Sequence, residues 1–350
     1  MARERIISGE AQGEDEVRLH VTLRPTKFDE YVGQESLIRK LRIAVQAAVG
    51  RKEPVEHVLL HGPPGLGKTS LAHVIANEVG AAVHVVAGPA ITRGADLTGI
   101  LNRLANGDVL FIDEIHRLPA VVEESLYSAM EDFKIDLTME AGVHARTITV
   151  PVKPFTLIGA TTRIGLLTSP MRSRFGIIAH VDYYPPEDLL RILHANARKL
   201  ELKADEPALK ELARRSRGTP RVAIRLLKRV RDFAAVEGDG QATVVVTRKA
   251  LELEGIDHRG LDDLDRAFLR TIIDVYAGGP VGIEAVAATL GEERDTLEDV
   301  VEPFLLQQAL VTRTRQGRRA TRAAYEHLGL TFTEPTGGTP GLFGEKDVQE

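Results

Sequence analysis

A glycine-rich segment of the sequence has the residue types and the spacing needed to bind a phosphate chain. Residues 62–69 have the sequence GPPGLGKT, which matches the pattern G-x-x-x-x-G-K-[ST]. Glycines let consecutive backbone N–H groups converge on phosphate oxygens, and a helix that begins near Lys68 adds the positive end of its dipole. We expect Lys68 to reach the β- and γ-phosphates and the Thr69 hydroxyl to bind Mg²⁺. The segment therefore predicts a site for a nucleoside triphosphate and Mg²⁺.

Two carboxylates follow a second apolar run. Residues 109–112 are apolar and lead directly into Asp113 and Glu114. Asp113 is expected to hold the Mg²⁺ shell, and Glu114 to polarise a water for attack on the γ-phosphate. Taken alone, the pair is equally typical of a solvated acidic turn. Beside the phosphate loop, it indicates hydrolysis of the nucleotide rather than storage.

Other polar residues follow predicted strands or begin predicted helices. A hydroxyl in residues 159–163, such as that of Thr162, can orient an attacking water, although a simple turn is the commoner interpretation. Arg172 and Arg174 lie near a predicted domain edge, where an arginine can stabilise charge on a neighbouring subunit's γ-phosphate. Arg221 follows Pro220 in the first turn of a predicted helix, an unfavourable end for a cation, which hints that it faces an anion.

The elements that must position these residues alternate between strands and helices. Apolar runs predict strands at 57–60, 82–86, 109–112 and 155–158, and helical spacing predicts helices at 36–49 and 68–79. Strands that alternate with helices favour an α/β fold whose parallel sheet is covered on both faces.

One stretch breaks this alternation. Residues 133–152 alternate between apolar and polar side chains on either side of Ala141-Gly142, which predicts a protruding β-hairpin. Its apolar side chains either bury themselves on a partner protein or pack on the chain's own core, and the pattern leaves both open. The side chains in question are Leu137, Met139, Ile148 and Val150.

Beyond Pro185-Pro186 the pattern becomes helical and predicts a small helical domain. Its expected helices span 187–200, 205–216, 220–236 and 247–254. From Gly260, helices at 261–276, 281–289 and 294–309 precede a two-stranded ribbon from Leu310 to Arg322, turning at Gln316-Gly317, which is the order of a winged helix. The ribbon region is basic, with Arg313, Arg315, Arg318, Arg319 and Arg322.

A basic ribbon suits contact with duplex phosphates, which needs no reading of base sequence. The alternative is an ordinary solvated face. No aromatic residues interleave these arginines, so stacking on single strands is not expected.

Composition narrows the class of protein. The chain has 350 residues, 43% hydrophobic and 27% charged, which is typical of a soluble protein of two or three domains. The absence of cysteine excludes disulfides and cysteine-bound zinc and fits a cytoplasmic protein. No secretory signal or membrane span is expected, and the net charge of −5 requires any DNA contact to use a local basic patch. Residues 1–20 and 331–350 are expected to be flexible.

Together these motifs resemble the AAA+ ATPases, and within them the ring motors that migrate Holliday junctions. The similarity extends from Leu23 to Leu330 and is most specific at 23–34, 61–70, 130–133, 159–163, 172–176, 218–221 and 291–303. It implies a large ATPase domain at 21–184, a helical lid at 185–256 and a winged-helix DNA-binding domain at 257–330.

The resemblance also implies roles for individual residues. Adenine and phosphate contacts, with ATP and Mg²⁺ as ligands, match Leu23, Arg24, Gly65, Gly67, Lys68, Thr69, Ser70, Tyr184 and Arg221. Thr162 matches the first sensor and Arg221 the second sensor. Positions that match contacts to a neighbouring subunit's nucleotide are Glu131, Asp132, Phe133 and the arginine finger Arg174.

The implied assembly is a homohexamer that translocates duplex DNA through the wing residues Arg313 and Arg318, with Arg294 as a further candidate contact. The implied partners are RuvA, docked on the hairpin at 133–152, the resolvase RuvC in the same complex, and the junction itself. Two alternatives remain open at this point: a clamp-loader-like AAA+ switch that opens another ring protein, and a DNA-bound regulator that senses ATP without turning it over.

Overall fold

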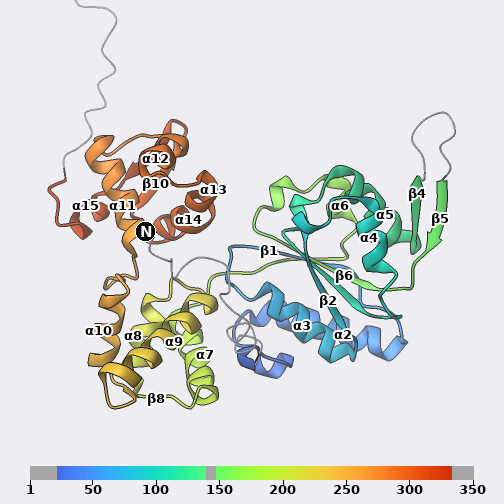
Figure 1. Ribbon diagram of the computed structural model, residues 1–350, viewed down its shortest axis with the longest axis horizontal. Helices are drawn as coiled ribbons and strands as arrows, with labels where there is room; N and C mark the ends of the chain where they lie inside the picture. Colours follow the sequence, from blue (N-terminus) through green and yellow to red (C-terminus); the bar gives the residue numbers. More distant parts are fainter. Residues whose placement is uncertain (1–21, 139–146, 333–350) are drawn as a thin grey trace, which may run out of the picture. The chain divides into compact units, whose positions relative to one another are not determined.

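A five-stranded parallel sheet forms the centre of the first part of the chain (Figure 1). The computed structural model describes residues 22–138 and 147–332. The strand order is β2-β3-β6-β1-β7, which confirms the expected parallel α/β sheet. Its strands are β1 (Val58–His61), β2 (Val83–Ala87), β3 (Val109–Asp113), β6 (Thr156–Thr161) and β7 (Ile177–His180).

Helices cover both faces of this sheet (Figure 1). One face carries α2 (Glu35–Arg51) and α3 (Lys68–Val79), and the other carries α4 (Gly94–Leu101), α5 (Ala120–Asp132) and α6 (Ser169–Ser173). Every residue of β6 is buried, as expected for a strand covered on both faces. None of the described helices is long and apolar enough to span a membrane.

The edge strand β7 was not predicted. Its side chains alternate between half-buried and exposed, and Ile178 is 48% exposed. The apolar run at 177–179 is as short as that of β1, and a run of this length does not by itself distinguish a strand from a buried helix segment. The predictions for 1–20, for the Ala141-Gly142 turn and for most of 331–350 lie outside the described residues.

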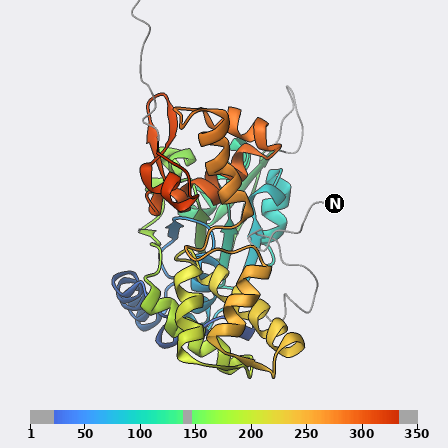
Figure 2. The same ribbon diagram turned by 90° about the vertical axis from the view of Figure 1, so that its left-hand side faces the viewer.

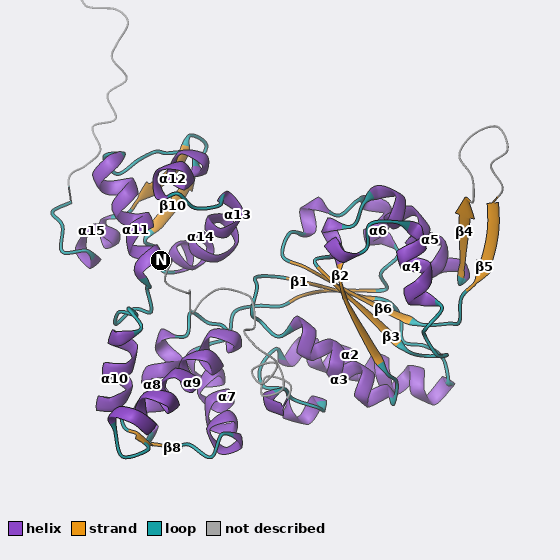
Figure 3. Ribbon diagram, in the orientation of Figure 1, coloured by secondary structure: helices purple, strands orange, loops and turns teal. Residues whose placement is uncertain are grey.

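A two-stranded antiparallel ribbon stands apart from the sheet, as the hairpin prediction required (Figure 3). It consists of β4 (Lys134–Thr138) and β5 (Thr147–Pro151). At its base, Ile135 is fully buried and belongs to the same core cluster as Val152. Val150, directly opposite Ile135, is half-buried, and farther out Ile148 is 48% exposed. The side chains of Leu137 and Met139 lie outside the described residues. The hairpin base is therefore core, whereas at least one outer apolar side chain faces solvent.

Four helices form the predicted bundle after the sheet, at the bottom of Figure 2 in yellow-green to light orange. They are α7 (Pro186–Lys199), α8 (Glu206–Arg215), α9 (Pro220–Glu237) and α10 (Val244–Leu253), with short strands β8 (Lys203–Ala204) and β9 (Gln241–Ala242) between them. Side-chain oxygens of Asp205 and Thr243 cap α8 and α10. Prolines begin α7 and α9, where a missing N–H costs no helical hydrogen bond.

The described residues from Gly255 onward form a second compact unit with its own core. Its elements are α11 (Asp263–Arg270), α12 (Ile283–Leu290), α13 (Arg294–Thr296), α14 (Glu302–Gln307), β10 (Val311–Thr314), β11 (Gly317–Ala320) and α15 (Arg322–His327).

The sequence prediction was wrong in three details of this unit. The expected helices 261–276 and 294–309 are each interrupted by a π-helical turn, at Thr271–Val275 and Leu297–Val301. The ribbon turns at Arg315-Gln316, and Gly317 already belongs to β11. The helix α15 was not foreseen. Gly317 has φ +136°, and a Cβ there would lie 2.3 Å from the Val281 carbonyl oxygen, so glycine is required by a close backbone approach.

Candidate functional site

The phosphate loop joins β1 to α3 by a path that requires its glycines. Gly62, Gly65 and Gly67 have φ values of +143°, +80° and +91°. A Cβ on Gly62 would lie 2.4 Å from the Val181 carbonyl oxygen, and one on Gly67 would lie 2.9 Å from the Tyr31 hydroxyl. Thr69 and Ser70 follow as half-buried residues in the first turn of α3, where the predicted phosphate and Mg²⁺ contacts need them.

Lys68 is a buried cation folded over this loop. Its Nζ donates hydrogen bonds of 2.8 Å to the carbonyl oxygens of Gly62 and Pro63. Burial lowers the pKa of Lys68 to about 8; Asp113 and Glu114 oppose this shift, and Arg221 adds to it. Burying the charged ammonium of Lys68 therefore costs desolvation free energy. An anion bound beside it would offset that cost.

The predicted acidic pair lies at the carboxyl end of β3, on the same sheet edge as the phosphate loop. Strand β6 lies between β3 and β1 in the sheet. The carboxyl ends of these three adjacent strands therefore carry Asp113, Thr162 and the phosphate loop. The backbone N–H of Glu114 donates to Asp113 Oδ1 at 3.0 Å, and Glu114 adopts a left-handed conformation with φ +49°. Glu114 Oε2 lies 3.3 Å from Nη1 of Arg117. Both carboxylates are half-buried, which suits groups that meet a ligand.

Two adjacent threonines at the end of β6 have different environments. Thr161 is 1% exposed. Its hydroxyl lies 2.9 Å from His116 Nδ1 and accepts a hydrogen bond from the Arg163 N–H at 3.0 Å. Thr162, the predicted sensor, is half-buried at the sheet edge between the loop and the acidic pair. The sequence could not distinguish the two hydroxyls, whereas the structure assigns Thr161 to internal hydrogen bonding.

Two expected base-binding residues are buried in the first unit, and Tyr184 is linked to the phosphate loop through Tyr31. Leu23 and Tyr184 are 4% and 5% exposed. The Tyr184 hydroxyl donates to the Tyr31 hydroxyl at 3.2 Å, and desolvation raises the pKa of Tyr31 to about 12. Tyr31 therefore stays protonated, and it links Tyr184, an expected base contact, to Gly67 of the phosphate loop. The sequence analysis assigned no such role to Tyr31.

Arg221 and Arg24 also reach this region. The Arg221 N–H donates to the Gly65 carbonyl oxygen at 3.2 Å, which places the start of α9 against the phosphate loop. Burial and then the charge of Arg221 lower the pKa of Arg24. With Arg221 near Lys68 and Arg24 near Arg221, the region is positively charged and favours a polyanion.

Arg174 does not join this group. It precedes β7 by three residues, and Ile177 pairs with Val58 at the amino end of both strands. The phosphate loop follows the opposite, carboxyl end of β1. A four-residue strand spans about 13 Å, so Arg174 and Lys68 of one chain lie on opposite edges of the sheet.

The other predicted subunit-contact residues share the Arg174 edge. Arg174 Nε lies 3.2 Å from Glu131 Oε1, and its Nη2 donates to Glu131 Oε2 at 3.2 Å. Asp132 pairs with Lys134 at 3.0 Å, and Phe133 packs edge-on against Phe155. The structure therefore brings Arg174 and residues 131–133 to the same edge of the sheet.

A small polar cluster not singled out from the sequence holds the Arg174 side chain. The guanidinium carbon lies 4.3 Å from the centre of the Tyr127 ring, a cation–π arrangement. The Tyr127 hydroxyl donates to Glu123 at 2.5 Å and lies 2.9 Å from the Thr168 hydroxyl. Arg174 Nη1 donates to the Pro170 carbonyl oxygen at 2.8 Å. These contacts bring together α5 and α6, so no local sequence signal announces them.

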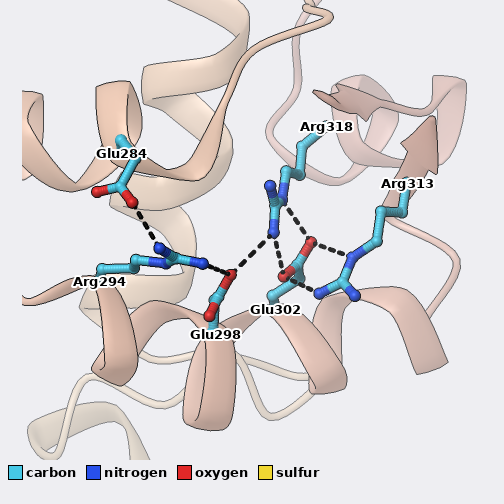
Figure 4. Close-up of polar contacts among 6 residues, drawn as sticks. All are labelled: Glu284, Arg294, Glu298, Glu302, Arg313 and Arg318. Atoms are coloured by element: carbon cyan, nitrogen blue, oxygen red, sulfur yellow. Dashed lines mark hydrogen bonds and ion pairs between the residues drawn. The ribbon is translucent and has the colours of Figure 1, made fainter. Parts of the chain in front are cut away.

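The predicted DNA-binding arginines of the second unit are all ion-paired. Arg313 and Arg318 lie opposite each other on β10 and β11, and both contact Glu302 (Figure 4). Arg294 contacts Glu284 at 2.7 Å and Glu298 at 3.2 Å. The sequence predicted a basic ribbon, but not the carboxylates that partner it.

The lowered pKa of Lys68 leads to a prediction about proton uptake. An anion beside Lys68 raises its pKa again, so at pH 9, between the lowered value of about 8 and the ordinary value of 10.5, nucleotide binding should take up most of one proton. At pH 7 Lys68 is already charged, and its uptake should be near zero. Calorimetric titration at pH 9 and pH 7, in buffers of different ionisation enthalpy, measures this.

The variant Lys68→Arg is the control, because its guanidinium does not titrate in this range. Equal uptake at pH 9 by the parent and this variant would show that another group supplies the effect.

Three family models together match nearly all of the described chain. They are the Holliday junction DNA helicase RuvB P-loop domain at residues 23–181, the RuvB AAA lid domain at 184–257 and the RuvB C-terminal winged helix domain at 258–329. The expected order of ATPase core, lid and winged helix agrees with these matches.

Sequence relatives and solved structures agree with the family models. The Holliday junction branch migration complex subunit RuvB of Desulfosudis oleivorans is 56% identical over 89% of this chain and 91% of its own length. That of Myxococcus xanthus is 55% identical over 90% and 92%. The Thermotoga maritima RuvB Holliday junction branch migration motor superposes with a TM-score of 0.81 at 48% identity, covering 89% of this chain and 100% of that one. The chain therefore belongs to the RuvB family of AAA+ proteins.

Proposed function

We propose that this chain is an ATP-hydrolysing motor subunit that drives branch migration of Holliday junctions in recombination and DNA repair. One observation carries the proposal beyond family membership. The nucleotide-binding group around Lys68 and the arginine group around Arg174 lie on opposite edges of one sheet. A single chain thus holds two half-sites that a neighbouring copy would complete, which supports a closed ring, here proposed to be a homohexamer.

Within one half-site the residues divide the chemistry of hydrolysis. Lys68 and the loop N–H groups bind the phosphates, and Arg221 approaches them from the lid. Thr69 and Asp113 offer a hydroxyl and a carboxylate, the hard oxygen donors that Mg²⁺ prefers, and when bound Mg²⁺ would neutralise phosphate charge. Glu114 accepts a proton from the attacking water, and Thr162 orients that water.

The second half-site supplies a positive charge to the nucleotide bound by a neighbouring subunit. Arg174, presented by Tyr127 and Glu131, would stabilise the γ-phosphate of the neighbour during transfer to water. Its ion pair with Glu131 holds the guanidinium at the surface before that contact forms. Hydrolysis is then coupled to the arrangement of adjacent subunits, as a rotary motor requires.

DNA and protein partners contact other surfaces. The winged-helix unit would track the duplex backbone through its basic ribbon, and the exposed part of the hairpin at 133–152 would bind RuvA, with RuvC in the same complex. Ile148, 48% exposed on β5, supports a docking role for the hairpin. The expected setting is the cytoplasm, where the junctions form.

The two alternative functions are less well supported. The clamp-loader hypothesis is not favoured, because the relatives that share about half of the chain's residues are branch migration subunits. A regulator that only senses ATP would not need Asp113 and Glu114 beside Lys68 on one sheet edge.

Replacing Glu114 tests the motor function. Glu114→Gln removes the proton acceptor but keeps the shape, so ATP should still bind while turnover falls by about 10²–10⁴-fold. Dissociation of a synthetic junction by purified RuvA and this chain should require hydrolysable ATP and fail with Glu114→Gln. Glu124→Gln, an exposed carboxylate on α5, is the matched control. Junction dissociation at the parent rate with a non-hydrolysable analogue would refute the motor.

Mixing two inactive variants tests the shared site. Lys68→Ala and Arg174→Ala should each lack turnover, and Arg174→Ala should still bind ATP. Random equal mixing places an intact Lys68 opposite an intact Arg174 at half times half, or about a quarter, of the interfaces, so ATPase activity should reappear. Arg51→Ala, at a 59% exposed arginine that ends α2, is the control and should hydrolyse ATP normally. Two variants that stay inactive when mixed would argue against completion in trans.

The hairpin predicts a separable partner contact. Ile148→Ser removes an exposed apolar side chain, and losing the burial of an isoleucine should weaken RuvA binding by about 10–100-fold. Biosensor titration of RuvA, with thermal unfolding of the variant, measures this. Val236→Ser, at an 82% exposed valine of α9, is the control. If Ile148→Ser lowers the melting temperature but not RuvA affinity, this residue belongs to the core.

A further inference from the structure

A fully buried carboxylate lies beneath the basic ribbon of the second unit (Figure 4). Glu302 has 0% exposure and accepts four hydrogen bonds from two guanidinium groups. Arg313 donates Nε to Oε1 at 3.1 Å and Nη2 to Oε2 at 2.5 Å. Arg318 donates Nε to Oε1 at 2.8 Å and Nη2 to Oε2 at 3.1 Å. Both contacts are therefore bidentate, the geometry that most restricts an arginine side chain.

The two arginines need a carboxylate between them. Arg313 and Arg318 are directly opposite in the antiparallel register of β10 and β11, and like charges at such positions repel. Burial acts to raise the pKa of Glu302, but hydrogen bonds from Arg313 and Arg318 hold it below the ordinary value. Glu302 thus stays ionised and permits both cations on one face of the ribbon.

The network contains two exposed cations. Only 13% of the Arg318 side chain is exposed, compared with 55% for Arg313. Arg318 Nη2 also lies 3.4 Å from Glu298 Oε1, which accepts from Arg294 Nη2 at 3.2 Å. Arg294 is 52% exposed and pairs with Glu284 as well. The order is thus Glu284, Arg294, Glu298, Arg318, Glu302 and Arg313, with Arg294 and Arg313 accessible.

From this arrangement we infer that Glu302 is a positioning residue for DNA binding, which fixes the Arg313 guanidinium for a backbone phosphate. The inference rests on the proposed function, because it assumes that the ribbon contacts duplex DNA. A free arginine loses about 2 kcal/mol of rotamer entropy on immobilisation, and a guanidinium already fixed by Glu302 avoids most of that loss when it binds. Arg318 links this anchor to Glu298, which accepts one hydrogen bond from Arg294 at 3.2 Å.

A charge-cancelling role for Glu302 makes the opposite prediction. If Glu302 only competed with phosphate for the arginines, removing its charge would strengthen DNA binding and steepen its salt dependence. A positioning role predicts weaker binding although the protein becomes more positive. The sign of the change therefore separates the two roles.

The test measures binding of the full chain to a fluorescent duplex of arbitrary sequence over a range of salt concentrations. Glu302→Gln should bind about tenfold more weakly, with a slope of log affinity against log salt that is shallower by about one. Glu326→Gln, which breaks an exposed 3.0 Å pair with Arg322 in the same unit and changes the charge equally, should bind no more weakly than the parent. Equal or tighter binding by Glu302→Gln would overturn the inference.

A double-mutant cycle separates positioning from general loss of structure. In an Arg313→Ala background, Glu302→Gln should have at most a small further effect on affinity, because the group that it positions is gone. A tenfold further loss in that background would overturn the inference. Should Glu302→Gln fail to fold, Glu298→Gln in parent and Arg294→Ala backgrounds makes the same test. Arg313→Ala binding as tightly as the parent would instead refute the proposed DNA contact itself.

Discussion

Parallel pairing between β1 and its neighbours is the constraint on which the nucleotide chemistry depends. In a parallel sheet all carboxyl ends meet at one edge, so the loop after β1, the acidic pair after β3 and the threonines after β6 lie together. The same pairing places whatever precedes β7 on the other edge. This strand geometry keeps Arg174 away from the phosphate loop of its own chain. In the proposed function, a complete site is therefore formed by two chains.

The two units stabilise a buried charge in different ways. At Lys68 the ammonium is desolvated and bonded only to carbonyl oxygens of the loop, so its pKa is lowered and an anion is favoured there. At Glu302 the carboxylate is saturated by two guanidinium groups and needs nothing further. The first arrangement suits a ligand that comes and goes during a catalytic cycle. The second suits a rigid surface against which a polymer can slide.

Some of this organisation was predictable from particular residues. The glycines and Lys68 of residues 62–69, and the apolar run before Asp113, follow patterns whose chemistry is local, and the structure places them as expected. The hairpin at 133–152 was predictable because alternation is also local. The strand β7, the helix α15 and the two π-helical interruptions were missed, because their short or continuous patterns resemble turns and uninterrupted helices. Tyr31 and Tyr127 gave no signal, because their contacts join segments distant in sequence.

By itself, the sequence determined the chemistry that this chain can perform: a phosphate loop, a pair of carboxylates and a basic ribbon each depend on residue types within a few positions. Only the tertiary structure decided which of those groups act together. It placed Lys68 and Arg174 on opposite sheet edges, distinguished Thr161 from Thr162, and placed a buried Glu302 under two arginines that the sequence shows only as positive charge. The physical reason is that burial and pairing depend on contacts between distant segments, and these contacts set the charge, orientation and accessibility of each side chain.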